Sequence, residues 1–208
     1  MTTQWYWHEG RIQGQALKLN VGAGCALEEG YINCDWVAAP GIDAVFDLMQ
    51  HWPFDDNSVD EVKAFEVVEH LPNLIHFMDE AWRVLKPDGT LIVRTCPPFV
   101  NNAWRDPTHV RPYLPESFQY FDSDSPYHRW GRLYTDKAWR FLGWEHIGRD
   151  AFLVRLMPRR EAASKPQMVS GGLSGECKDN TRNGKLSAGK QEDANVLEDK
   201  LPFAEPLR

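Results

Sequence analysis

The sequence has few cysteines, no long apolar run and no excess of basic residues. Its four cysteines, Cys25, Cys34, Cys96 and Cys177, form no CxxC pair and no finger-like spacing with histidine. Neither a disulfide scaffold nor a structural zinc site is therefore expected, and we predict no metal site. No stretch approaches the roughly 18 apolar residues of a membrane span, and the N-terminus lacks a signal-peptide pattern. These absences predict a cytoplasmic protein without membrane contact.

Basic residues are outnumbered by acidic ones, which gives a formal net charge of −7. A negative surface repels phosphate backbones, so a nucleic-acid partner is disfavoured and would require a local basic patch. The apolar fraction of 42% and the charged fraction of 25% are ordinary for a globular enzyme. A chain of 208 residues is long enough for one α/β domain.

Tryptophan and tyrosine are missing from residue 145 onward, since all nine Trp and all six Tyr precede that position. Residues 159–208 contain a single Phe and are rich in Ser, Gly, Lys and Glu. Such a segment buries too little apolar surface to offset its ordering entropy. We therefore predict a folded domain over residues 1–158 and a disordered tail over residues 159–208.

Apolar runs of strand length are spaced along the predicted domain. Between the fourth and fifth run, residues 72–89 carry an apolar stripe at helical spacing, which predicts an amphipathic helix. Residues 135–158 predict a short helix and then two strands joined at Arg149-Asp150, an antiparallel hairpin. Several runs are apolar throughout, as in strands covered on both faces. The five runs lie at 17–21, 31–36, 43–47, 61–65 and 90–96.

This order of elements predicts an α/β fold with a Rossmann-like, mostly parallel, seven-stranded sheet and a C-terminal antiparallel hairpin. Only the six residues CALEEG lie between the first glycine loop and the second strand. The first crossover helix is therefore predicted to be shortened or absent.

The glycine loop Gly22-Ala23-Gly24 ends the first predicted strand, and Asp35 ends the second. Glycine lets a ligand approach the main chain, and a carboxylate after the second strand can accept both hydroxyls of a ribose. The fingerprint for dinucleotides needs a third small residue, where this chain has Leu27, and a longer spacing than the 13 residues from Gly22 to Asp35. The pattern indicates a nucleoside without a diphosphate; ordinary turns remain the alternative.

Longer motifs surround this loop, namely NVGAG, NCDW, FDLMQHWPFDDNSVDEV and EVVEHLPNLIHFMDEAWRVLKPDGTLIV. In these motifs the sequence resembles the class I S-adenosylmethionine-dependent methyltransferases, in particular small bacterial and phage members related to the type 11 group. The resemblance covers residues 17 to 157. It implies S-adenosylmethionine as cofactor. The resemblance does not identify the methyl acceptor: a small molecule is expected, and lipids, modified nucleobases or a protein side chain are the alternatives.

The resemblance also implies roles for single residues. Asp35 holds the ribose diol, Asp47 with the Leu48 backbone receives the adenine amino group, and Glu66 faces the sulfonium. Asp47 alternatively caps the turn before Trp52-Pro53. The full set of expected cofactor-binding residues is Asn20, Gly22, Ala23, Gly24, Asp35, Trp36, Asp47, Leu48 and Glu66.

Residues 99–130 form an insert rich in aromatic residues, His and Arg, placed where this fold usually builds its substrate pocket. His109 is the candidate general base, with Asp106 or Arg111 orienting it or the substrate. A structural histidine that ties down the insert is an equal alternative. Glu69 and His70 either lie near the reacting methyl or cap the following helix.

Two other functions fit parts of the sequence. An NAD(P)-dependent oxidoreductase would use the same glycine loop, although the short crossover and the lack of a Tyr-x-x-x-Lys proton relay argue against it. A catalytically silent module would keep the fold but catalyse no reaction, and would only bind a nucleoside or a partner. Binding of S-adenosylmethionine or of NADH separates the three.

Overall fold

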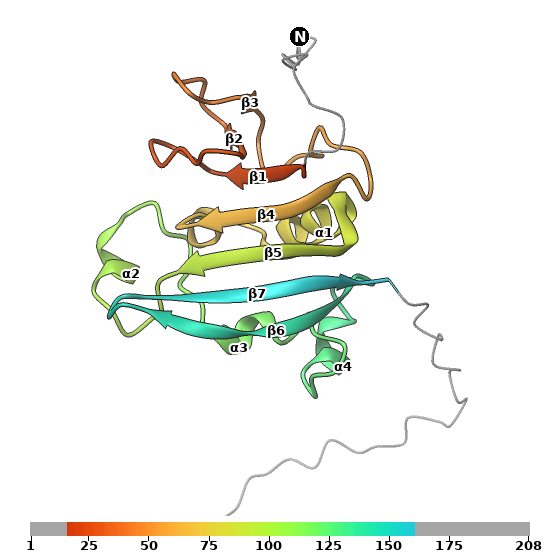
Figure 1. The fold of residues 1–208 in the computed structure, drawn as a ribbon. Helices are drawn as coiled ribbons and strands as arrows, with labels where there is room; N and C mark the ends of the chain where they lie inside the picture. The colour runs from red at the N-terminus through yellow and green to blue at the C-terminus, as the bar shows by residue number, and fades with distance from the viewer. Residues whose placement is uncertain (1–15, 161–208) are drawn as a thin grey trace, which may run out of the picture. The chain divides into compact units, whose positions relative to one another are not determined.

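Seven strands form one mixed sheet in the order β3-β2-β1-β4-β5-β7-β6 (Figure 1). The computed structural model describes residues 16–160. The first five strands pair in parallel, and β7 is antiparallel to both β5 and β6, so the predicted fold class is confirmed. The strands are β1 (Lys18–Val21), β2 (Ile32–Asp35), β3 (Ala44–Val45), β4 (Val59–Phe65), β5 (Leu85–Thr95), β6 (Ala138–Ile147) and β7 (Ala151–Arg159).

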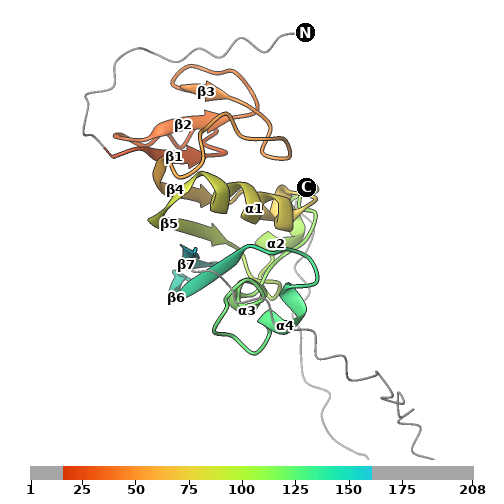
Figure 2. The same cartoon turned by 90° about the vertical axis from the view of Figure 1, so that its right-hand side faces the viewer.

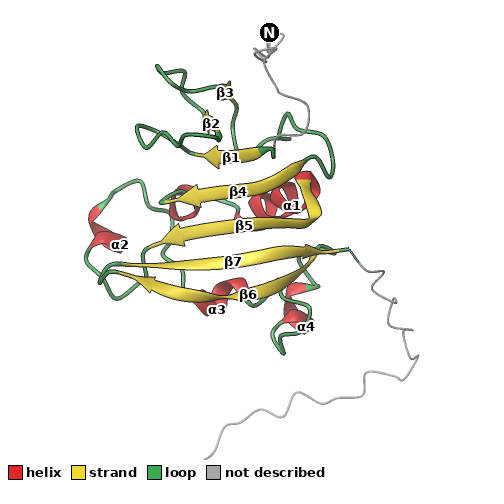
Figure 3. Cartoon of the chain, in the orientation of Figure 1, coloured by secondary structure: helices red, strands yellow, loops and turns green. Residues whose placement is uncertain are grey.

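The helices gather on one face of the sheet, as the edge-on view of α1, α3 and α4 in Figure 2 shows. Only loops connect β1 to β2 (Figure 3), so the predicted loss of the first crossover helix is confirmed for residues 22–31. The helical elements are the 3₁₀ turn η1 (Val68–His70), α1 (Leu74–Val84), α2 (Asn102–Arg105), α3 (Pro115–Phe118) and α4 (His128–Gly131).

Helix α1 begins where Asn73 accepts a hydrogen bond from the His76 backbone N–H at 3.1 Å, an N-cap. Its apolar stripe packs against the sheet, and the chain enters β5 directly at Leu85. The predicted amphipathic helix is therefore confirmed. Its buried apolar residues are Phe77, Met78, Ala81 and Val84.

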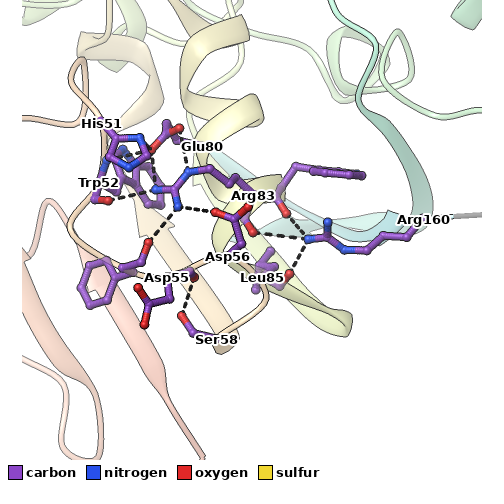
Figure 4. A network of polar contacts seen from close by, with 11 residues as sticks. His51, Trp52, Asp55, Asp56, Ser58, Glu80, Arg83, Leu85 and Arg160 are labelled. Atoms are coloured by element: carbon purple, nitrogen blue, oxygen red, sulfur yellow. Dashed lines mark hydrogen bonds and ion pairs between the residues drawn. The ribbon is translucent and has the colours of Figure 1, made fainter.

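Arg83 of α1 holds the connection from β3 to β4 in place (Figure 4). Its guanidinium donates to both Glu80 carboxylate oxygens at 3.0 and 2.8 Å, to the Trp52 and Phe54 carbonyls and to Asp56. Glu80 also accepts the Trp52 N–H at 2.7 Å. Burial opposes ionisation of Glu80, but these donors outweigh it and hold its pKa below the usual range.

The predicted short helix after Thr135 is wrong, because residues 138–147 form strand β6. This segment pairs with β7 over its whole length, and the Trp139 side chain is fully buried. Cross-strand pairing and burial of a large aromatic therefore override the local helix signal. The predicted hairpin itself is confirmed, with Gly148, Arg149 and Asp150 at its turn.

The described chain continues slightly beyond the predicted domain end at residue 158. Arg159 belongs to β7, and Arg160 donates to the Trp82 and Leu85 carbonyls at the end of α1 (Figure 4). The predicted tail from residue 161 onward, with Cys177, lies outside the described residues, as do residues 1–15. Within residues 16–160, no helix is long and apolar enough to cross a membrane.

Candidate active site

The glycine loop turns sharply at the end of β1. Gly22 has φ of +65°, and a Cβ built on it would lie 2.5 Å from Cγ2 of Val67. Any side chain there would combine a left-handed backbone with a steric clash, so the position requires glycine. Gly24 also has a left-handed φ of +50°, and its N–H donates to the Asp35 carboxylate at 2.8 Å. The loop is thereby joined to the end of β2.

Asp35 accepts two backbone hydrogen bonds, from Gly24 on one oxygen and from Val37 at 3.1 Å on the other. A carboxylate offers about four acceptor positions, so both oxygens keep capacity for a further donor. The next residue, Trp36, exposes 79% of its surface beside this carboxylate. An acceptor pair next to an exposed aromatic ring suits a ribose and its base.

Asn20 and Ala23 support the loop from beneath. The buried Asn20 amide donates to the Ala26 carbonyl and to Asn33 Oδ1, both at 2.9 Å. The Ala23 N–H donates to the Cys34 carbonyl at 2.9 Å. Both amide hydrogens of Asn20 are thus engaged inside the protein, and Asn20 positions the loop.

A cavity of about 580 Å³ opens beside the loop. Asp47 lines it and also accepts the Met49 N–H on Oδ1 at 2.8 Å, so the turn-capping alternative for Asp47 is observed. That bond occupies one carboxylate oxygen and leaves the other for a ligand. The cavity is lined by Gly22, Asp35, Trp36, Asp47, Leu48, Met49, Glu66, Val67, His70, Leu71, Pro72 and Thr108.

Glu66 ends β4 in a left-handed conformation, with φ of +55°. This region is uncommon for a residue with a Cβ and is held by the surrounding structure at many functional sites. The Glu66 N–H donates to the Arg94 carbonyl at 2.9 Å, and the Arg94 guanidinium donates to the Glu66 carboxylate at 2.8 Å. Strand β5 therefore fixes Glu66 at the edge of the cavity.

A second cavity, of about 590 Å³, adjoins the first, and Glu66 and His70 line both. The insert after β5 supplies one wall, and the β6–β7 turn supplies another. The structure thus brings His109 and Asp106 to one cavity. Its other lining residues are Arg94, Asn102, Arg105, Pro107, Ile147, Asp150 and Ala151.

Hydrogen bonds among residues 16–160 join Asp106 to Thr108, and through Thr108 to His70, but not to His109. The Asp106 carboxylate accepts the Thr108 N–H at 2.9 Å and the Thr108 hydroxyl at 2.7 Å, and these bonds lower its pKa. The same hydroxyl oxygen lies 2.9 Å from His70 Nδ1. His109 instead bonds the Ala103 carbonyl through Nδ1 at 3.0 Å.

Glu69 of η1 is fully buried, and neither of its carboxylate oxygens has a hydrogen-bond partner among the described residues. Burial raises the pKa of Glu69, and the negative charge of the nearby Glu66 carboxylate also acts to raise it. Its backbone carbonyl accepts the Val110 N–H at 2.7 Å, which ties the insert to η1. Glu69 is thus neither a helix cap nor part of an ion pair.

Sequence reasoning assigned no definite role to four residues at this site: Glu69, His70, Arg94 and Thr108. The pair Glu69-His70, directly after β4 at the sheet edge, was a usable signal. Arg94 and Thr108 carry no such signal in the sequence, because an arginine that alternates with apolar residues in a strand and a threonine in a loop occur in most proteins.

Parts of the sequence are similar to known methyltransferases. A family model described as "Methyltransferase domain" matches residues 27–93. A probable S-adenosylmethionine-dependent methyltransferase of Mycolicibacterium smegmatis is 39% identical over 56 residues, which are 27% of this chain. The matched segment spans only 22% of that relative's length.

Solved structures share the fold. The YcgJ protein of Bacillus subtilis superposes with a TM-score of 0.50 at 16% identity, over 70% of this chain and 92% of that one. The [4+2]-cyclase SpnF gives a TM-score of 0.51 at 15% identity, over 71% and 76%. The chain is thus similar to methyltransferases in sequence over residues 27–93 and over the 56 residues shared with the curated relative, and it shares the fold of the solved structures.

Proposed function

We propose that this chain transfers a methyl group from S-adenosylmethionine, bound in the cavity beside Gly22, to a small polar molecule in the cavity beside His109. One observation carries the proposal. The two cavities share a wall made of Glu66 and His70, so a donor and an acceptor would meet there. Methyl transfer is an in-line displacement at an activated carbon, which such an arrangement favours.

On the cofactor side, Asp35 would hold the ribose diol, Asp47 and Leu48 the adenine, and Glu66 would lie near the sulfonium. No helix follows the glycine loop within residues 22–31, so a diphosphate would lack the helix N-terminus that usually binds it. A sulfonium nucleoside carries no phosphate. This absence favours S-adenosylmethionine over NAD(P).

On the acceptor side, the cavity carries charges of both signs, from Arg94 and Arg105 and from Asp106 and Asp150. Its volume of about 590 Å³ is in the range of small-molecule sites. Mixed charge in a cavity of this size suits a small polar acceptor. The net charge of −7 disfavours a nucleic-acid acceptor.

Asp35→Ala tests the cofactor side. The change removes the ribose acceptors and releases the Gly24 N–H, so affinity for S-adenosylmethionine should fall by about 1–3 kcal/mol, or roughly 5- to 150-fold. Isothermal titration of the purified protein measures it. Asp88→Ala, at an exposed position near the start of β5, is the matched control and should bind like the wild type. Equal affinity of Asp35→Ala and wild type would remove the ribose role.

Binding alone does not establish transfer, because one protein with this fold is a [4+2]-cyclase. The wild-type protein should therefore move labelled methyl from S-adenosylmethionine into the small-molecule fraction of a cell extract, read by mass spectrometry. Tight binding of NADH would instead support the oxidoreductase. Binding of neither cofactor would support a silent module.

A further inference from the structure

We propose that Glu69, His70 and His109 bind a divalent first-row transition-metal cation at the wall between the two cavities. Each of the three residues offers one ligand atom, and these atoms all lie within 4.8 Å of one another. Glu69 is buried and both histidines are half-buried. Two imidazoles and one carboxylate are a common donor set for such cations.

Two separate parts of the chain build this cluster. Glu69 and His70 belong to η1, directly after β4, whereas His109 lies in the insert after β5. The Val110 N–H donates to the Glu69 carbonyl at 2.7 Å and anchors the insert on η1. The rings of His70 and His109 then meet edge to face, with centroids 4.6 Å apart. The cluster therefore depends on backbone contacts that hold both segments.

Hydrogen bonds fix both imidazoles in the form that binds metals. His109 Nδ1 lies 3.0 Å from the Ala103 carbonyl, which only accepts, so Nδ1 carries the hydrogen. The Thr108 hydroxyl donates its own hydrogen to Asp106, so it can only accept from His70 Nδ1. Each neutral ring therefore keeps a lone pair on Nε2. Outer partners of this kind orient the histidine ligands of known metal sites.

The state of the Glu69 carboxylate favours binding of a cation. It is fully buried, and neither oxygen has a hydrogen-bond partner among the described residues. A buried carboxylate without a partner is costly, and a bound cation removes that cost. The Arg94 guanidinium, which lines the second cavity, is already paired with Glu66.

The spacing suits a metal centre with open positions. Ligand atoms bound to one Zn²⁺ at about 2.0–2.2 Å lie about 3–4 Å apart, so small side-chain rotations would bring all three onto one ion. Three protein ligands leave coordination positions for an oxygen of the acceptor. The cation's use in methyl transfer rests on the proposed function, but its binding does not. His109 then serves as a ligand in place of a general base.

The test is titration of the metal-free, full-length protein with Co²⁺, followed by its visible d–d absorption, with Zn²⁺ as competitor. One equivalent of Co²⁺ should bind and be displaced by Zn²⁺. Glu69→Gln keeps the size of the buried side chain, and His109→Ala removes one imidazole. Each variant should weaken Co²⁺ binding by about tenfold or more. Circular dichroism and thermal melts check that both variants are folded.

His51→Ala is the matched control, because the His51 side chain is 74% exposed and lies outside the cluster. It should bind Co²⁺ like the wild type. Absence of Co²⁺ absorption in the wild type, or equal affinity in Glu69→Gln, His109→Ala and wild type, would overturn the site. Titration with S-adenosylmethionine is run in parallel. Cofactor binding without Co²⁺ binding defeats the metal site alone, and Co²⁺ binding without cofactor binding defeats the proposed function alone.

Discussion

His109→Ala is expected to slow methyl transfer by about 10–100-fold or more, because the change removes one ligand of the cation proposed to hold an oxygen of the acceptor. His109 lines the proposed acceptor cavity, and its Nε2 keeps a lone pair. Affinity for S-adenosylmethionine should stay unchanged, because the cofactor cavity lacks His109 among its lining residues. The expected signature is a loss of rate without a loss of cofactor binding.

The measurement is the initial rate of labelled methyl transfer into the small-molecule fraction of an extract, with titration of S-adenosylmethionine on the same preparation. His51→Ala, outside both cavities, should keep the wild-type rate. An unaltered rate in His109→Ala would assign His109 to tying down the insert. A fall in rate that is explained by a lower melting temperature of the variant would also indicate that His109 only holds the insert in place.

Arg83→Ala is expected to lower the free energy of unfolding by about 3–5 kcal/mol, the range for removing one partner of a buried ion pair. The side chains of Arg83 and Glu80 are only 17% and 11% exposed. Without Arg83, the Glu80 carboxylate stays buried with the Trp52 N–H and the weak His51 contact, and the Trp52 and Phe54 carbonyls lose a donor (Figure 4).

Denaturant unfolding at neutral pH measures this change. Arg155→Ala is the matched control, because it breaks an ion pair with Glu145 whose side chains are 44% and 50% exposed. Exposed pairs contribute about 0–1 kcal/mol. If Arg83→Ala costs no more than Arg155→Ala, the network around Arg83 does not stabilise the fold. Because the Glu80 pKa is lowered, the stabilisation should be present at neutral pH and decline on acidification.

Local patterns in the sequence were enough to predict most of the strands and helix α1. Buried strands and one amphipathic helix follow from apolar periodicity, which depends on near neighbours in the sequence. The segment after Thr135 was predicted as a helix, because its apolar and polar residues alternate irregularly. Its strand conformation comes from pairing with β7. Strand β5 also begins five residues earlier than predicted, at Leu85. Such boundaries depend on partners distant in sequence.

The carboxylates of the proposed cofactor site are expected from the sequence to lie close together, for a similar reason. Gly22, Asp35 and Asp47 each follow a strand, and in a parallel sheet the carboxyl ends of neighbouring strands meet at one edge. The position of Asn20 in the NVGAG run does not reveal which way its amide donates. In the structure it donates to Ala26 and Asn33.

The sequence by itself determined the succession of strands along the chain, the glycine loop and the carboxylates that follow it, because these depend on residues close together along the chain. Only the tertiary structure decided which groups meet at the wall between the cavities. His70 and His109 are 39 residues apart, and their contact is produced by hydrogen bonds from the insert to the Glu69 carbonyl. Contacts across such loops carry no local pattern, since they arise only when the sheet has brought both segments to one edge.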